Sequence, residues 1–297
     1  MSRDEEAEAR ATLDRVLGEA RPRLHRYCAR MTGSVIDGED VVQETVVKAI
    51  EALGRSGPIT EMERWLFRIA HNASLDFLRR RARQEAVRSD EDPDMIVDPA
   101  ATIQDRQIAA AGVRTFMQLP VPQRSSVILK DVLGYSLDEV GGILDTSIPA
   151  VKAALHRGRA RLRVLAEQPD DAAPPVLTAA ERARLAAYVD RFNARDFDTL
   201  RDMLADDARL DLVGRLQRHG RGEVARYFTN YAKVADWRLV PGLVDRQPAV
   251  LVRDLADPHA RPVYFVLLRW ADKHLAVIRD FRYARYVIEG AEVVTAE

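Results

Sequence analysis

The sequence predicts a multidomain chain with an all-α first half and an α+β last third, and three observations support this fold class. Apolar residues recur at helical spacing through most of residues 10–165, which predicts one helix after another. Short, β-rich apolar segments follow one another closely between residues 249 and 288. Two acidic stretches that contain proline, 85–104 and 166–177, lack this periodicity and are typical of linkers.

Three helices are expected before the first linker, at residues 10–31, 37–53 and 61–84. The second begins with acidic residues, which a helix N-terminus favours because of its dipole. The third follows a Thr-x-x-Glu capping box formed by Thr60 and Glu63. It ends in the basic run RRRAR at residues 79–83.

Helices resume after the first linker, at residues 102–118 and 121–133. A capping box at Ser136 and Glu139 then opens a helix over 137–144, and a tight turn leads into a helix over 148–165. This spacing predicts a helix-turn-helix, the motif that places its second helix in the major groove of DNA. A plain helical hairpin is the alternative, since such hairpins are common.

The last third combines helices with strands. A third capping box, Thr178 and Glu181, opens the first of three helices, and four closely spaced strands follow. This order predicts an α+β domain with an antiparallel sheet. The helices are expected at 179–193, 196–205 and 222–232, and the strands at 249–255, 262–270, 274–281 and 283–288.

A formal net charge of −1 conceals local asymmetry. Residues 79–83 hold four arginines, and residues 152–163 hold five basic residues and no acid, whereas 89–105 holds six acids and no base. Clustered arginine and lysine indicate contacts with phosphate, and a solvated helix face is the alternative interpretation.

Composition and pattern also exclude several classes. A single cysteine, Cys28, rules out an internal disulfide and a cysteine-cluster zinc site. No stretch approaches the roughly 20 apolar residues of a membrane helix, and MSRDEEAEAR does not resemble a signal peptide. No phosphate-binding or dinucleotide fingerprint is present. We therefore expect a cytoplasmic protein with no cofactor, metal or catalytic residue.

Three ordered motifs resemble those of bacterial RNA polymerase sigma factors of the extracytoplasmic-function (ECF) group, in the sigma-70 family. DGEDVVQETVVKAIEAL resembles region 2.2, MERWLFRIAHNASLDFLRRRAR resembles regions 2.3 and 2.4, and LPVPQRSSVILKDVLGYSLDEVGGILDTSIPAVKAALHRGRARLR resembles region 4. The resemblance implies a region 2 domain at 10–84, a linker at 85–104, a region 4 domain at 105–165, and a second linker at 166–177.

The resemblance implies a function that is not enzymatic: binding core RNA polymerase through its β′ clamp and β subunit, recognising the −10 and −35 promoter elements, and initiating transcription. For the residues that the resemblance implies in polymerase binding, the alternative interpretation is an ordinary solvated surface. The recognition helix reads AVKAALHRGR, so Ala153 and Ala154 replace a serine and an arginine of the usual pattern. The residues implied are Asp40, Gln43, Glu44 and Lys48 for polymerase, Arg68, Asn72, Arg79 and Arg80 for the −10 side, and Lys152, His156, Arg157 and Arg159 for the −35 side.

Residues 178–290 lie outside that match and resemble the SnoaL-like cone fold. We expect a fused regulatory domain that contacts regions 2 and 4. The alternative is a bifunctional protein whose SnoaL-like domain is a small-molecule sensor or an enzyme. His274 and Asp280, six residues apart on one strand, lie about 20 Å apart and cannot form a dyad. The residues that could line a pocket are Asp211, His219, Trp237, Arg253 and Tyr264.

Overall fold

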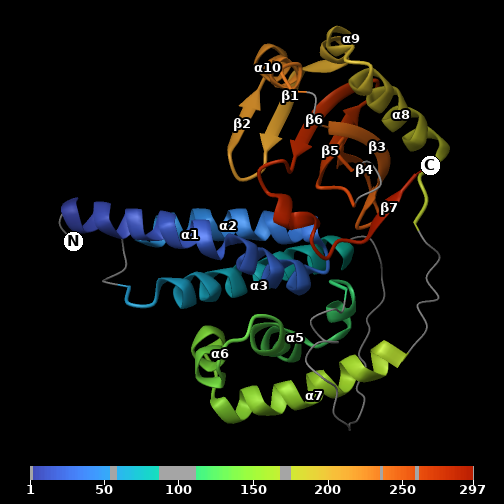
Figure 1. Ribbon diagram of the computed structural model, residues 1–297. Helices are drawn as coiled ribbons and strands as arrows, with labels where there is room; N and C mark the ends of the chain where they lie inside the picture. The colour runs from blue at the N-terminus through green and yellow to red at the C-terminus, as the bar shows by residue number, and fades with distance from the viewer. Residues whose placement is uncertain are drawn as a thin grey trace. The chain divides into compact units, whose positions relative to one another are not determined.

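The computed structural model describes residues 3–53, 59–86, 112–167, 175–234, 237–257 and 261–296. The chain divides into two compact units, Met1–Asp171 and Ala172–Glu297 (Figure 1). Each unit has its own hydrophobic core. Most of the two expected linkers, 85–104 and 166–177, lies outside the described residues. No helix within the described ranges is both long and apolar enough to cross a membrane.

Three long helices open the first unit: α1 (Arg3–Thr32), α2 (Val35–Leu53) and α3 (Met62–Ala86). They confirm the three helices expected before the first linker. α1 packs closely against α2, because Gly38 of α2 lies where an added Cβ would come within 2.6 Å of the backbone of Ala29. Glycine is required here to let the two helices approach.

A 3-10 turn η1 (Thr115–Gln118), helix α5 (Val121–Val127) and a π-helical turn η2 (Ile128–Val132) follow. The helix expected over 102–118 is wrong in its described part, because residues 112–118 form only turns and η1. Leu119 is extended, as the residue before a proline usually is, and Pro120 then caps α5.

The expected helix-turn-helix is confirmed as α6 (Leu137–Leu144) and α7 (Ile148–Glu167). Ser136 and Glu139 form the predicted capping box at the start of α6. α6 ends at Asp145, whose φ of 51° lies in the left-handed region that aspartate tolerates better than most residues. The chain therefore turns sharply into α7.

One hydrophobic core joins the helices on both sides of the first linker, and it includes Leu24 of α1, Phe67 of α3, Ile143 of α6 and Leu155 of α7. The separate domain boundaries at residues 84 and 105 stay a prediction. Within the described residues, the two segments pack as a single body.

A buried arginine strengthens that connection. Arg124 of α5 donates hydrogen bonds to the carbonyl oxygens of Met31 at 2.7 Å, Leu119 at 2.9 Å and Met117 at 3.1 Å. Burial lowers the pKa of Arg124 to about 10, which still leaves it charged near neutral pH. A charged group with both terminal nitrogens bound to carbonyls fixes the end of α1 against the start of α5.

The second unit has the expected α+β class and the order of helices followed by a curved sheet that the SnoaL-like resemblance implies (Figure 1). Within the described residues its sheet has the strand order β2-β1-β6-β5-β4-β3-β7. α8 packs on β3, and α10 packs on β1. The elements are α8 (Ala179–Asn193), α9 (Phe197–Asp202), α10 (Arg221–Tyr231), β1 (Leu204–Leu212), β2 (Leu216–His219), β3 (Trp237–Val244), β4 (Gln247–Asp254), β5 (Tyr264–Ala271), β6 (His274–Asp280) and β7 (Val293–Thr295).

Three details of the second unit differ from the expectation. The sheet is mixed, because β1 and β6 run parallel; the long connection through α10 and β3–β5 lets both strands run the same way. The strand expected at 283–288 is a 3-10 turn, η3 (Arg285–Ile288). The helix expected at 196–205 stops early, at Asp202, because Leu204 already begins β1.

Candidate nucleic-acid interface

The residues expected on the −10 side share the exposed face of α3. Arg68, Asn72, Arg79 and Arg80 are all exposed, while the opposite face of the helix is buried in the core. His71, the neighbour of Asn72, instead turns inward, where its Nδ1 lies 2.8 Å from the Tyr27 hydroxyl. Burial lowers the pKa of His71 to about 4, so it is neutral at physiological pH.

The aromatic residues of α3 belong largely to the core. Phe67 is fully buried, with its ring 5.9 Å from that of Tyr27 and 5.3 Å from that of Tyr135, both in edge-to-face packing. Trp65 and Phe77 are half-buried and pack on the same core. Phe67 is therefore unable to stack on a base.

Arg68 makes a contact that the sequence did not predict. Its guanidinium donates to the carbonyl oxygen of Gly142 in α6 at 2.7 Å, so the candidate −10 face of α3 lies against the helix-turn-helix. Arg64 approaches the same glycine so closely that an added Cβ would come within 2.5 Å of its guanidinium.

Glu63 lies at the centre of a second contact between these segments. The predicted capping role of Glu63 with Thr60 is wrong, because the Glu63 carboxylate accepts a hydrogen bond from Tyr135 at 2.7 Å and pairs with Arg23. Arg23 also lies over the Tyr135 ring. Burial, together with the bond to Glu63, raises the pKa of Tyr135 above its ordinary value, so the hydroxyl stays a donor.

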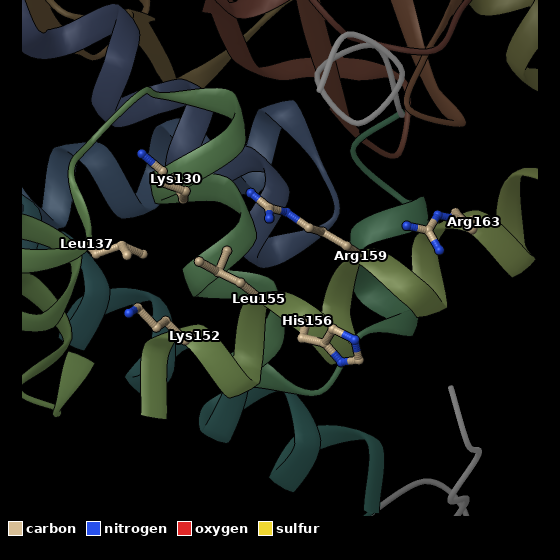
Figure 2. Close-up of a pocket in the computed structure, with 7 residues that line it drawn as sticks. All are labelled: Lys130, Leu137, Lys152, Leu155, His156, Arg159 and Arg163. Atoms are coloured by element: carbon tan, nitrogen blue, oxygen red, sulfur yellow. The ribbon is translucent and has the colours of Figure 1, made fainter. Parts of the chain in front are cut away.

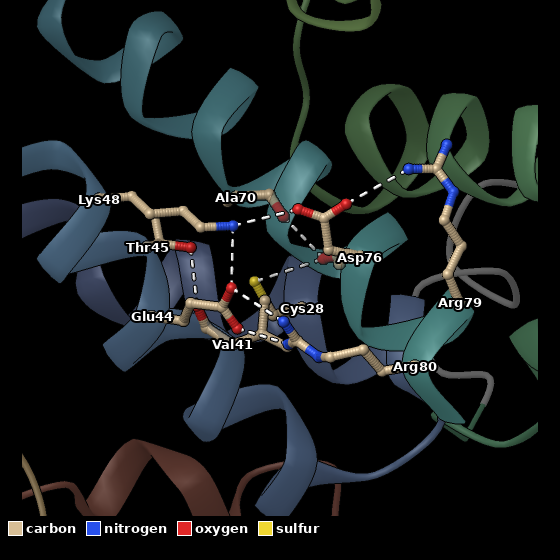
Figure 3. A network of polar contacts seen from close by, with 10 residues as sticks. Cys28, Val41, Glu44, Thr45, Lys48, Ala70, Asp76, Arg79 and Arg80 are labelled. Carbon is tan, nitrogen blue, oxygen red and sulfur yellow. Dashed lines mark hydrogen bonds and ion pairs between the residues drawn. The ribbon is translucent and has the colours of Figure 1, made fainter. Parts of the chain in front are cut away.

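The residues expected to bind polymerase lie on α2, where Asp40 is exposed and Gln43, Glu44 and Lys48 are half-buried. Figure 3 shows that this face is linked by ion pairs to α3. Glu44 accepts from Arg80 at 2.7 Å and pairs with Lys48 at 2.8 Å. Lys48 in turn reaches Asp76 of α3 at 3.2 Å.

These pairs connect the two predicted sets of residues. The hydrogen bond from Arg80, opposed by partial burial and reinforced by Lys48, lowers the pKa of Glu44 below its ordinary value. Arg80, expected to contact promoter DNA, is thus bound to a residue expected to contact polymerase. Sequence periodicity places each residue on a face but does not reveal a pair between two helices.

On α7, the residues expected on the −35 side differ in how far they are exposed. Lys152, His156 and Arg157 are exposed, whereas Arg159 is half-buried and bound in two places by Asp131 of η2. The two Arg159–Asp131 hydrogen bonds measure 2.9 and 2.5 Å. Arg159 therefore has a structural partner that the sequence did not predict.

The two alanines of the recognition helix are not equivalent. Ala154 is buried in the core of the first unit, whereas Ala153 is half-buried. Position 154 therefore does not face the DNA groove. Only position 153 stands where a polar side chain could reach DNA.

A basic pocket of about 330 Å³ opens between η2, the start of α6 and α7 (Figure 2). Two of its basic residues, Lys130 and Arg163, were absent from the predicted site. The spacing of basic residues along α7 could have indicated Arg163, since it continues the stripe of 152, 156 and 159. The lining residues are Lys130, Leu137, Lys152, Leu155, His156, Arg159 and Arg163.

The interior of the second unit holds a buried carboxylate. Asp280 of β6 is fully buried and accepts hydrogen bonds from Tyr231 at 2.8 Å, Tyr227 at 3.0 Å and the backbone N–H of Arg282 at 2.8 Å. The Tyr231 hydroxyl also lies 3.0 Å from that of Tyr264. Burial raises the pKa of Asp280 above its ordinary value, and these donors oppose the rise.

The residues proposed to line a pocket in this unit are scattered. Trp237 and Tyr264 are buried in the core, Asp211 pairs with Arg279 at 3.1 Å, and His219 is exposed on β2. Arg253, on β4, donates to Thr295 at 3.2 Å. Among the described residues, no group of three His, Cys, Asp or Glu side chains could hold a metal ion.

Two family models match the first unit: Sigma-70 region 2 over residues 17–84, and Sigma-70, region 4 over residues 113–162. The chain is 34% identical over 176 residues to the ECF RNA polymerase sigma factor ShbA of Streptomyces griseus, which covers 55% of this chain and 91% of ShbA. This chain belongs to the ECF sigma factors. In this sigma factor, α2 and most of α3 lie within the region 2 match, and α5, α6 and most of α7 lie within the region 4 match.

A second relative of this sigma factor is the ECF RNA polymerase sigma factor SigE of Mycolicibacterium smegmatis, 33% identical over 154 residues. That match covers 50% of this chain and 60% of SigE, so the chain spans less than two thirds of this relative. A crystal structure of the Mycobacterium tuberculosis ECF sigma factor SigJ aligns with 88% of this chain and 93% of its own, at 19% identity and a TM-score of 0.33.

Proposed function

We propose that this ECF sigma factor binds core RNA polymerase, recognises −10 and −35 promoter elements and initiates transcription. The observation that carries the proposal is that both matched regions present an exposed helix face suited to DNA. On α3 this face holds Asn72 beside arginines, and on α7 it holds Lys152, His156 and Arg157. An amide can hydrogen-bond a base edge, while arginine and lysine bind phosphate and guanine.

Polymerase binding is assigned to the outer face of α2. Asp40, Gln43, Glu44 and Lys48 lie on one side of this helix and include both signs of charge, which suits a polar docking surface. By the family resemblance, this face meets the β′ clamp, and region 4 meets the β subunit. Transcription would place the protein in the cytoplasm.

The contact between α3 and α6 adds a requirement for DNA binding by α3. Arg68 cannot donate the same N–H to Gly142 and to DNA, so a DNA contact through that N–H requires the Arg68–Gly142 bond to break. The proposal therefore includes an opening of the first unit when polymerase and promoter bind. Opening would break the Glu63–Tyr135 bond as well.

Transcription in vitro with core polymerase, on templates from a random promoter library, tests the proposal. The full chain should give transcripts only with core polymerase and should select two separated elements. Asn72→Ala should change the selected −10 element and leave the −35 element alone, because a lost base contact costs about 1–3 kcal/mol at one position. Gln84→Ala, which removes another exposed amide of α3, serves as the control. A folded chain that supports no transcription on any template rejects the proposal.

For the second unit we propose a regulatory role, acting through contact with regions 2 and 4. Asp280, a fully buried carboxylate of this unit, is unsuited to catalysis because its oxygens are already bound by tyrosine hydroxyls and a backbone N–H. A catalytic carboxylate needs access to its substrate. The alternative, a small-molecule sensor or enzyme, predicts that a small molecule raises the unfolding temperature of the full chain.

A further inference from the structure

Two segments of the second unit leave its sheet side by side. β1 and β6 run parallel, and Leu212 pairs with Asp280 where both strands end. The backbone N–H of Val213 then donates to the carbonyl oxygen of Asp280 at 3.0 Å. Residues 213–215, which follow β1, and residues 281–285, which follow β6, therefore lie at the same end of the sheet.

An arginine and a tyrosine from these two segments form an exposed pair. The Arg215 guanidinium lies over the Tyr283 ring, 4.3 Å from its centre, in a cation–π contact. Arg215 is exposed, and 49% of the Tyr283 surface is exposed. The pair therefore presents an aromatic and a cationic group to solvent at one place.

Two further arginines, Arg282 and Arg285, lie beside that pair. Arg282 lies 5.2 Å from the centre of the Tyr231 ring, and Arg285 lies 5.6 Å from that of Tyr264. Both tyrosines are buried, and their hydroxyl oxygens lie 3.0 Å apart. A fixed aromatic ring holds a guanidinium without neutralising its charge, so these arginines can still bind an anion.

The charge of the exposed arginines is not offset by acids. Within the described residues, neither Arg215 nor Arg285 pairs with a carboxylate, whereas Arg191 of the same unit pairs with Asp196 at 3.1 Å. The Asp280 carboxylate, which precedes the second segment, is fully buried and bound by tyrosine hydroxyls. An exposed surface with arginines and an aromatic ring suits a partner that has both negative charge and flat rings.

We propose that an Arg–Tyr cluster formed by Arg215, Arg282, Tyr283 and Arg285 binds single-stranded nucleic acid. A base would stack on Tyr283, while the arginines bind phosphates. Single strands expose base faces beside a charged backbone, and proteins bind them through aromatic rings and arginines together. DNA and RNA single strands share this chemistry. The inference goes beyond the regulatory role proposed for this unit and does not depend on it.

The first test measures binding of the full chain, without polymerase, to oligothymidylate and oligouridylate of about 15 nucleotides and to a duplex of the same length. Tyr283→Ala should weaken binding of a single strand at least about fivefold, which corresponds to about 1 kcal/mol for one lost stacked base. Duplex binding should stay unchanged, because a duplex offers no free base face. Tyr283→Phe keeps the ring and should bind like the wild type. The oligonucleotide that loses affinity identifies DNA or RNA as the ligand.

A second test addresses the arginines. Arg215→Gln combined with Arg285→Gln should lower the slope of log affinity against log salt by about 1.4, at about 0.7 for each phosphate contact with a single strand. Arg182→Gln combined with Arg184→Gln is the matched control, since it removes two exposed arginines of α8 outside the cluster. That control should leave the slope nearly unchanged. Circular dichroism checks that every variant is folded.

Ultraviolet cross-linking of oligonucleotides that contain 5-bromouracil locates the contact, because regions 2 and 4 are also expected to bind DNA. A cross-link within residues 281–286 that Tyr283→Ala removes supports the proposal, even where another surface dominates the measured affinity.

Three outcomes overturn the inference and leave the sigma function untouched. The first is the absence of a cross-link in this segment together with unchanged affinity of Tyr283→Ala. The second is equal weakening of single-strand and duplex binding by Tyr283→Ala, which would exclude base stacking. The third is binding of polyglutamate that the arginine double variant loses while it retains oligonucleotide binding, which would assign the cluster to an acidic protein.

Discussion

Gly158 lies in the middle of α7, although glycine costs a helix about 1 kcal/mol relative to alanine. The structure supplies the reason. An added Cβ would lie 2.8 Å from Cγ2 of Val127 and 3.3 Å from Cβ of Gln123, both in α5. Val127 is fully buried and short, so it has little room to move. The glycine sets how closely the recognition helix packs on α5.

Gly158→Ala should therefore destabilise the first unit by about 1–3 kcal/mol, because overpacking outweighs the gain in helix propensity. Denaturant unfolding of the full chain measures the change. Gly18→Ala is the matched control, since Gly18 is exposed in α1 with nothing within 4 Å of an added Cβ. That variant should be more stable than the wild type by up to about 1 kcal/mol. Equal stabilisation by both substitutions would contradict the packing argument.

Asp280 should make the stability of the second unit depend on pH. Its pKa is raised by burial in the folded state, so the folded state holds the proton more tightly than the unfolded state. The stabilisation is complete below the unfolded pKa, near about 3.9, and is lost as pH rises through the folded pKa.

Asp280→Asn, which cannot ionise, should remove that part of the pH dependence. Thermal unfolding of the full chain, followed by circular dichroism from acidic to neutral pH, measures it. Asp206→Asn is the control, because the Asp206 side chain is 96% exposed. If the Asp280→Asn chain loses stability with rising pH as steeply as the wild type, another group is responsible.

At the scale of elements, ion pairs between α2 and α3 connect the predicted polymerase-binding face of α2 with the predicted DNA-binding face of α3. Glu44 bonds Arg80 and Lys48, and Lys48 bonds Asp76, so the polymerase-facing side of α2 also orients the basic end of α3 (Figure 3). Exposed ion pairs of this kind contribute between 0 and about 1 kcal/mol each.

Charge reversal on α2 should separate the two roles. Asp40→Lys, at an exposed position, should weaken capture of core polymerase and change the unfolding free energy by less than about 0.5 kcal/mol. Glu44→Lys should weaken capture as well, and it should also weaken DNA binding by the holoenzyme because Arg80 loses its partner. Pull-down of core polymerase and promoter binding by the purified holoenzyme measure the two effects. Wild-type capture by both variants would remove α2 from the interface.

Local signals account for the elements that the sequence predicted well. The capping boxes at Ser136 and Thr178 fixed the starts of α6 and α8, since they involve only neighbouring residues. Two strands, β1 and β3, were not predicted from the sequence. β1 is rich in charged residues, and β3 contains Pro241 and Gly242, so neither has the alternating apolar pattern of a strand. Their conformation depends on pairing with strands far along the chain.

In the candidate site, too, features set by the local sequence were predicted, and contacts between distant segments were not. Helical spacing correctly placed Asn72 and Lys152 on exposed faces, because exposure follows from the periodicity of one helix. It could not predict that Asp131 binds Arg159 or that Arg68 bonds Gly142, because those contacts join segments 28 and 74 residues apart. Assignment to DNA or polymerase came from the family motifs.

At the scale of the whole molecule, the described residues form two hydrophobic cores, one in each unit. We therefore expect the first unit to fold without the second. A tethered unit acts at a high effective concentration, in the millimolar range for short linkers, so even a weak contact with regions 2 and 4 would be populated.

Removing the second unit by ending the chain at residue 171 should raise transcription from the selected promoter several-fold. The expected reason is the loss of a tethered contact that competes with polymerase and promoter. Transcription by the two chains at equal concentration, each checked by circular dichroism, measures the change over a range of core polymerase concentrations. Equal activity throughout that range would argue against regulation by this unit.

The bond between Arg68 and Gly142 has a consequence for competition among sigma factors in a cell. If only the opened first unit engages polymerase, the apparent dissociation constant equals the intrinsic one divided by the opened fraction. A tenfold smaller opened fraction, equivalent to about 1.4 kcal/mol, would require tenfold more protein to occupy the same share of polymerase. The bonds from α3 to Gly142 and Tyr135, together with the hydrophobic core that these segments share, would then set the abundance at which this sigma factor begins to compete for polymerase.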